Sequence, residues 1–138
     1  MVNNTSSQNR GSVRIPYLGA LVAAYVALTA VNLVVLVILS VLGSVQATDT
    51  AWGHAVVVAI FAVLLPLRYR AACRGSVGAL RAIGIISGVI LAVNVVEASI
   101  PGFAPSWMRI VMIVTALVAA GSVASIVRFR LRTQGNPK

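Results

Sequence analysis

Five residues of the chain have side chains that could bind or move protons and ions: Asp49, His54, Asn94, Glu97 and Arg109. Each lies near the end of a long apolar run. Carboxylate and imidazole groups exchange protons in general acid–base catalysis. Together these residues could form a polar mouth for an ion, proton or small ligand, or an acid–base site acting on a lipid or quinone.

Glu97 is one of only two acidic residues in the chain, so its environment decides between these readings. A carboxylate inside a membrane is costly and often functional. A carboxylate at the membrane surface, paired with Arg109 or hydrogen-bonded to another neighbour, needs no function. Both interpretations remain open from the sequence. One His, one Cys and two acids match no metal-ligand spacing, so we expect neither a metal site nor a cofactor.

The elements that must position these residues are apolar helices. The chain is 59% hydrophobic and only 9% charged, against about 25% charged residues in soluble domains. Residues 15–48, 50–67, 82–96 and 110–127 contain no Asp, Glu, Lys or Arg. A helix needs roughly 17–25 apolar residues to cross a bilayer. We therefore predict an all-α polytopic membrane protein, a four-transmembrane-helix bundle.

The expected helices span about 17–43, 50–68, 77–98 and 107–128. They form one domain over 15–132, between a disordered polar tail at 1–14 and a second tail at 133–138. Val45-Gln46-Ala47 resembles a signal-peptide cleavage site. However, the apolar run before it exceeds the about 7–15 residues of such a peptide. We expect residues 17–43 to remain as a helix.

The net charge of +9 is distributed unevenly along the chain. Basic residues precede the first helix, follow the fourth and lie between the second and third, whereas the other two connections are poor in them. This pattern predicts a plasma-membrane protein with both termini in the cytoplasm. It also predicts contact with anionic lipid headgroups rather than nucleic acid. The residues that carry the pattern are Arg10, Arg14, Arg68, Arg70, Arg74, Arg128, Arg130 and Arg132.

Helical spacing predicts which faces point at protein. Polar residues that lipid cannot satisfy should lie inside the bundle, and small residues let another helix approach closely. Trp52 and Trp107 are expected at the membrane interface. The predicted intramembrane polar contacts are Tyr25, Thr29, Asn32, Ser87, Thr115 and Ser122, and the predicted packing line is Gly84, Gly88 and Ala92. That line could close the bundle or join two copies of the chain.

The stretch LLPLRYRAACRGSVGALRAIG, followed by VNVVEASIPGFAPSWMR, resembles small four-helix integral membrane proteins of actinobacteria. The resemblance covers residues 54–128 and implies a membrane location without any particular activity. We expect a non-catalytic accessory, regulatory or immunity-type membrane protein with a membrane-protein partner. The alternatives are a small oligomeric transporter or channel and, third, a membrane enzyme acting on a lipid or quinone.

Overall fold

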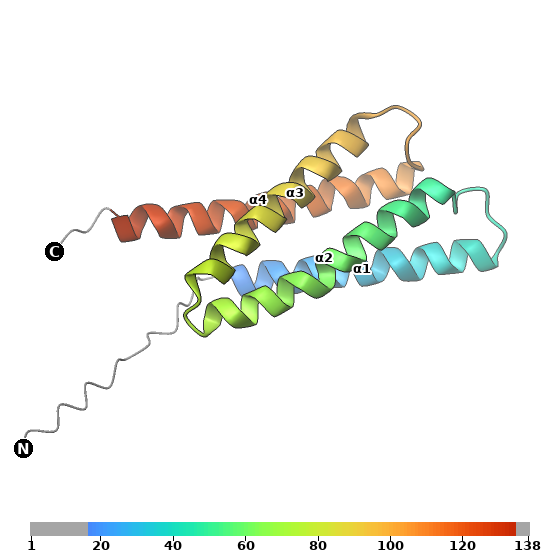
Figure 1. Cartoon of the computed structure of the whole chain (residues 1–138). Coiled ribbons are helices and arrows are strands. Elements are labelled where there is room, and N and C mark those ends of the chain that lie inside the picture. The colour runs from blue at the N-terminus through green and yellow to red at the C-terminus, as the bar shows by residue number, and fades with distance from the viewer. Residues whose placement is uncertain (1–16, 135–138) are drawn as a thin grey trace, which may run out of the picture.

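The computed structural model describes residues 17–134, and these form four helices joined by three short connections (Figure 1). The helices are α1 (Leu18–Val41), α2 (Asp49–Cys73), α3 (Val77–Ser99) and α4 (Ser106–Gln134). Each helix packs against its neighbour in the chain, and α1 also packs against α4, which closes the bundle. The expected all-α four-helix bundle is confirmed.

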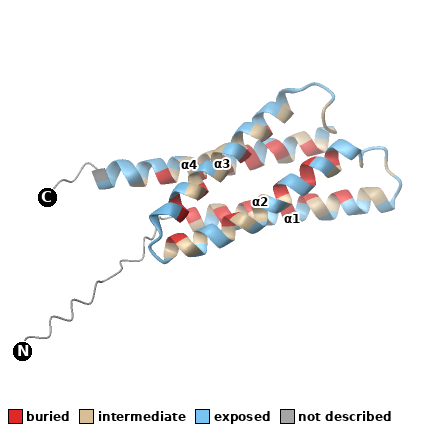
Figure 2. Ribbon diagram, in the orientation of Figure 1, coloured by how far each residue is buried: buried red, intermediate tan, exposed pale blue. Residues whose placement is uncertain are grey.

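All four helices are long and apolar enough to cross a membrane, and the chain is a multi-pass membrane protein. The shortest, α3, has 23 residues, or about 34 Å at about 1.5 Å per residue. Large apolar side chains such as Val31, Ile85 and Leu117 are more than half exposed on the outside of the bundle. Figure 2 shows this outward exposure along every helix. Lipid is the solvent that such a surface requires.

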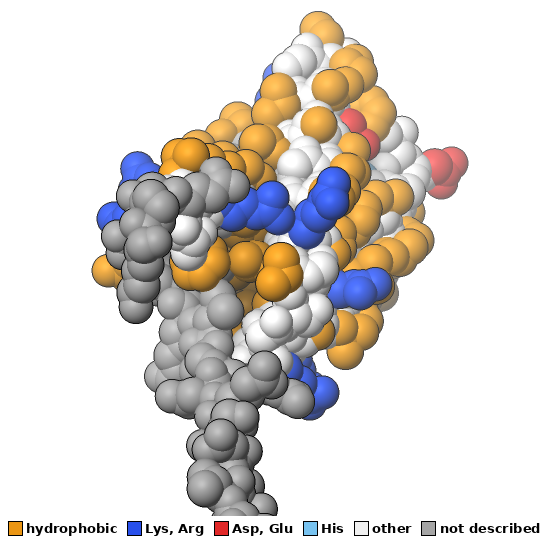
Figure 3. All heavy atoms as spheres, turned by 60° about the vertical axis from the view of Figure 1, so that its left-hand side comes forward, with side chains coloured by type: hydrophobic (Ala, Val, Ile, Leu, Met, Phe, Trp, Pro, Cys, Tyr) orange, Lys and Arg blue, Asp and Glu red, His pale blue; other side chains and the backbone are white. Residues whose placement is uncertain are grey.

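The bundle has two chemically different ends. The end that carries the α1–α2 and α3–α4 connections is here called the two-loop end, on the right in Figure 1. The opposite end carries the α2–α3 connection, and is here called the arginine end. Figure 3, which brings this end forward, shows arginine side chains gathered there and acidic side chains set back from it.

Local sequence explains where the helices start and turn. The hydroxyl of Thr48 accepts a hydrogen bond from the Ala51 N–H, and Ser76 does the same for the Ala79 N–H, each at 3.2 Å. These are N-caps that satisfy otherwise free N–H groups of α2 and α3. The tight α2–α3 connection needs a positive φ at Gly75, which is +87°. Glycine adopts this conformation without a steric penalty.

Two helices extend beyond their predicted ends. We expected α2 to end near residue 68, but it continues through Pro66 to Cys73. Proline removes one backbone hydrogen bond, and neighbouring helices can hold such a helix together. We expected α4 to end near residue 128 and a tail to begin at 133, but α4 continues to Gln134. Arginines in a last turn interact favourably with the helix dipole, so charge does not end the helix. The tail at 1–14, with Arg10 and Arg14, lies outside the described residues.

The core consists of two separate apolar clusters. The cluster at the two-loop end contains Leu36, Ala51, Ala55, Met108 and Met112. The other fills the bundle from its middle to the arginine end, and its members include Leu18, Tyr25, Val58, Ile83, Ile90 and Ala119. On α1 and α4, buried polar residues lie between members of the two clusters, and with polar residues of α2 and α3 they form the candidate site.

Candidate functional site

The candidate site is a polar layer, defined here as Thr29, Asn32, His54, Asn94, Glu97 and Thr115. On α1 and α4, its members lie between residues of the two apolar clusters. On α1, for example, Asn32 lies between Leu36 of the two-loop cluster and Tyr25 of the other cluster. On α4, Thr115 likewise lies between Met112 and Ala119. On these two helices, the layer is therefore bounded by apolar side chains on both sides.

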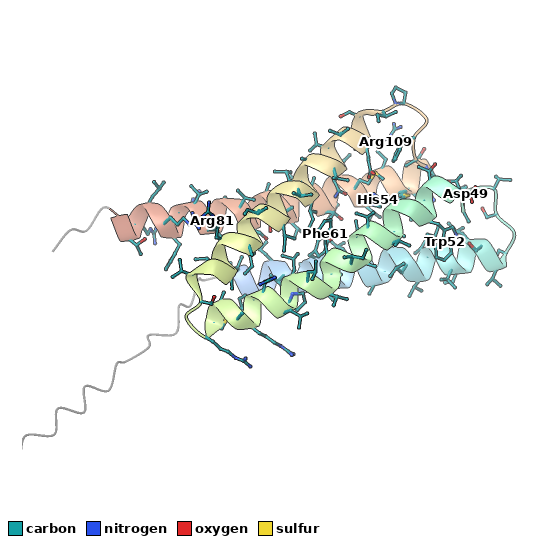
Figure 4. All side chains as sticks on the ribbon, in the orientation of Figure 1. Asp49, Trp52, His54, Phe61, Arg81 and Arg109 are labelled. Carbon is teal, nitrogen blue, oxygen red and sulfur yellow. The ribbon has the colours of Figure 1, made fainter. Side chains whose placement is uncertain are left out.

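His54 and Glu97 form the central contact of this layer. His54 Nδ1 pairs with Glu97 Oε2, which links α2 to α3. The side chain of His54 is 5% exposed and that of Glu97 is 20% exposed. A charge at such a site is tolerated when it is paired and hydrogen-bonded. Figure 4 shows His54 facing into the bundle toward its two-loop end.

A small cavity adjoins His54 on the inside of the bundle. It has a volume of about 10 Å³ and is lined by Leu28, Thr29, Asn32, His54, Val58, Val111 and Thr115. The side-chain oxygen of Asn32 is buried and has no hydrogen-bond partner. A polar cavity of roughly 10–15 Å³ holds one water molecule. The cavity therefore suits one water that donates to Asn32.

Buried apolar side chains lie on both sides of the layer. Leu36, Ala55 and Met112 are fully buried on its two-loop side. Val58, Ile90 and Ala119 are buried on its other side.

Asn94 of α3 does not line the small cavity. It lines a groove of about 420 Å³, here called the α3–α4 groove. Asn94 is only 1% exposed; its amide Nδ2 donates to the Ile90 carbonyl at 2.8 Å, and its side-chain oxygen has no partner. The groove is lined by Leu91, Asn94, Val95, Ala98, Ser99, Ile113, Ala116, Leu117 and Ala120.

The structure separates the five residues with which the sequence analysis began. His54 and Glu97 meet, and Asn94 lies one helical turn from Glu97 on α3. Arg109 takes no part in the ion pair, which is the one found among the described residues. Asp49 is exposed in the first turn of α2 and is not part of that pair. The alternative in which Glu97 pairs with Arg109 is therefore wrong, because α2 turns His54 toward Glu97 instead.

The two tryptophans lie at the two-loop end, where both pack against its apolar cluster. The Trp52 indole N–H donates to the Ser40 hydroxyl at 3.1 Å, which ties α2 to α1. The Trp107 indole N–H is buried without a partner among the described residues. Figure 4 places Trp52 with Asp49 at this end, as an interface position requires.

Two of the six predicted intramembrane polar residues make hydrogen bonds within their own helix. Thr29 and Ser122 donate to the carbonyls of Tyr25 and Val118, each four residues earlier. Serine and threonine commonly satisfy their hydroxyls in this way inside helices. Tyr25 differs, because its hydroxyl donates to the Val58 carbonyl of α2 at 3.0 Å. Ser87 is buried, but it does not line the cavity that Asn32 and Thr115 share.

The predicted packing line of Gly84, Gly88 and Ala92 makes no tight contact inside the bundle. A Cβ built on Gly84 would lie 3.8 Å from Ile126, and one built on Gly88 would meet nothing within 4 Å. The close approaches are at Gly19, beside Tyr69, and at Gly121, beside Leu21. The sequence analysis missed both, although Gly19, Ala23 and Ala27 also repeat every four residues.

Six of the basic residues that were predicted to contact lipid lie at the same end of the bundle, as the charge pattern predicted. Arg68, Arg70, Arg74, Arg128, Arg130 and Arg132 lie on the arginine end and are exposed. Arg81, which was not among them, also lies at this end (Figure 4). No group of three or more His, Cys, Asp or Glu residues within 17–134 could hold a metal ion.

The comparisons with known proteins give no relative from which the function of the site could be inferred. No protein-family model matches the chain, and no curated protein or solved structure matches it significantly.

Proposed function

We propose that this chain is a non-catalytic membrane protein that binds a transmembrane helix of a partner protein in the α3–α4 groove. Its role is then accessory, regulatory or of the immunity type. The observation that carries the proposal is the side-chain oxygen of Asn94, which is buried without a partner beside an open groove.

The position of Asn94 along α3 explains why its unpaired side-chain oxygen favours a partner helix. Asn94 lies five residues before the end of α3, or roughly 7–8 Å along the helix. An unsatisfied buried acceptor costs about 1–3 kcal/mol. Lipid chains have no donor to offer. A partner helix carrying Ser, Thr, Asn or Gln at this depth supplies one.

The walls of the groove suit a helix. Ala98 comes from α3, and Ala116 and Ala120 come from α4. Small residues let a third helix approach close enough for a short hydrogen bond and for extensive van der Waals contact. In contrast, Leu117 is 67% exposed beside these alanines. It gives an incoming helix a large apolar side chain to pack against.

Photocrosslinking in native membranes tests this proposal. A photoreactive amino acid at Leu117 should form an adduct with one other protein. The matched control is Val31 on α1, which is 60% exposed at a comparable distance from the two-loop end. We expect no protein adduct there. Adducts of equal yield at both positions, or adducts only with a second copy of this chain, would contradict the proposal.

A second candidate is proton transport, and the pair of His54 and Glu97 beside the water-sized cavity favours it. Imidazole gains and loses protons near neutral pH. Transport by this pair requires a path past the buried apolar side chains that lie on both sides of the layer. Proton flux into proteoliposomes should then be abolished in Glu97→Gln. Equal flux for the wild type and this variant would exclude the pair from transport.

A further inference from the structure

A second groove between α3 and α4 lies at the arginine end and differs in chemistry from the first. It has a volume of about 320 Å³. Its walls are apolar, with Ile85 from α3 and Val123 and Val127 from α4. Arg81 and Arg130 also line it, one from each helix. An apolar trough with two guanidinium groups is complementary to an amphiphile with an anionic head.

The two arginines have no acidic side chain to pair with in this chain. The sequence contains only two acidic residues, and both Asp49 and Glu97 lie at the two-loop end. Arg81 and Arg130 are exposed, so their guanidinium groups are accessible to a ligand. Helix α3 begins at this end, at Val77. Its dipole therefore adds further positive potential near Arg81.

We propose that this groove is a binding site for one anionic phospholipid. The phosphate lies between Arg81 and Arg130, and an acyl chain lies along Ile85, Val123 and Val127. Guanidinium groups bind phosphate oxygens through paired, charge-assisted hydrogen bonds. The apolar walls bury the acyl chain. The site is independent of the partner helix proposed above, because that helix occupies the other groove.

Gly84 keeps this groove open. A Cβ there would reach ordinary contact with Ile126, at 3.8 Å, so a larger side chain must extend into the trough. A phospholipid needs this space, whereas a free phosphate ion needs only the arginines. A bulky substitution of Gly84 therefore distinguishes the two ligands.

The test measures phosphatidylglycerol retained by the purified full chain after extraction from vesicles of phosphatidylcholine and phosphatidylglycerol. Native mass spectrometry counts the lipids bound to each chain. We expect Arg81→Gln/Arg130→Gln to lower the retained phosphatidylglycerol about tenfold or more. The matched control, Arg128→Gln/Arg132→Gln, removes the same charge from α4 outside the groove. We expect it to change retention by less than about twofold.

Gly84→Leu supplies the second arm, and circular dichroism verifies that each variant is folded. We expect Gly84→Leu to lower phosphatidylglycerol retention while both arginines remain. Equal losses of phosphatidylglycerol in Arg81→Gln/Arg130→Gln and in Arg128→Gln/Arg132→Gln would overturn the proposal. The lipid would then be attracted by the overall positive charge and not by this groove. Full retention of phosphatidylglycerol in Gly84→Leu would also overturn the proposal. So would inorganic phosphate that stabilises the wild type against unfolding as much as phosphatidylglycerol does. So would a groove occupied by a second copy, detected as a dimer mass without lipid.

Discussion

His54 and Glu97 are the two ionisable side chains that this fold brings together. His54 is almost fully buried, and a buried polar or charged group needs a hydrogen-bond partner, which Glu97 provides. The pair therefore holds α2 and α3 in one relative rotation.

Removing one side chain of the His54–Glu97 pair should lower the free energy of unfolding more than removing only the charge of Glu97. We expect His54→Ala to lower the free energy of unfolding by about 2 kcal/mol, less than for a fully buried pair, because Glu97 is partly exposed. Glu97→Gln keeps an oxygen that accepts from His54 and should cost only about 1 kcal/mol. Unfolding in detergent, followed by circular dichroism, measures both. Equal values for the two variants would show that the pair does not link the helices.

Asn94 should behave differently from this pair, because its oxygen has no partner within the described chain. Asn94→Leu removes an unsatisfied acceptor and adds apolar volume beside the groove. We expect the isolated chain to gain about 1 kcal/mol in the free energy of unfolding. The same unfolding assay measures this change. A loss of comparable size would mean that Asn94 is already satisfied inside the bundle.

The sequence identified the members of the polar layer but not their pairing. Asn94 and Glu97 were distinctive because polar residues are rare in these apolar runs. The positions of His54 and Glu97 along their helices also predicted that both lie at the same end of the bundle. The pairing depends on how α2 and α3 rotate against each other. Composition and spacing do not determine that rotation, so Arg109 was an equally reasonable partner for Glu97.

At the scale of the helices, the apolar runs predicted four membrane spans, and the structure has four such helices. The ends were less accurate for α2 and α4. Charge marks where the bilayer ends, but an arginine-rich segment can stay helical beyond it. Helix length therefore exceeds span length at the arginine end. The predicted glycine line makes no tight contact inside the bundle, and its alternative role, joining two copies of the chain, stays a prediction.

Two glycines should respond oppositely to the same substitution. A Cβ on Gly88 meets nothing within 4 Å, whereas a Cβ on Gly19 would lie 2.5 Å from the Tyr69 hydroxyl. We expect Gly88→Ala to raise the free energy of unfolding by about 0.5–1 kcal/mol through helix propensity. Gly19→Ala should lower it by about 1–2 kcal/mol through overpacking. Thermal unfolding in detergent compares the two, and losses in both variants would argue for close packing at Gly88.

At the scale of the whole molecule, charge divides the bundle into an arginine end and a two-loop end. The two grooves follow the same division, although both lie between α3 and α4. The groove at the arginine end is lined by Arg81 and Arg130, whereas the α3–α4 groove is lined by Asn94, whose side-chain oxygen is unpaired. The sequence predicted the charge asymmetry but not the grooves, because the grooves depend on how α3 crosses α4.

The charge asymmetry predicts that the arginine end faces the cytoplasm. Cys73 is the only cysteine in the chain and lies at this end. A membrane-impermeant maleimide should therefore label wild-type Cys73 only after cells are lysed. The control is Gln46→Cys in a Cys73→Ser background, which places a thiol on an exposed residue at the two-loop end. It should be labelled in intact cells, and the reverse pattern would contradict the predicted topology.

The most direct test of partner binding is the native mass of the chain released from its own membrane in polymer-bounded discs. We predict a complex heavier than the chain by one distinct protein, and loss of that protein in Asn94→Leu while the chain stays folded. A chain that carries only lipid, or a mass that is a multiple of the chain itself, would contradict a partner helix in the α3–α4 groove.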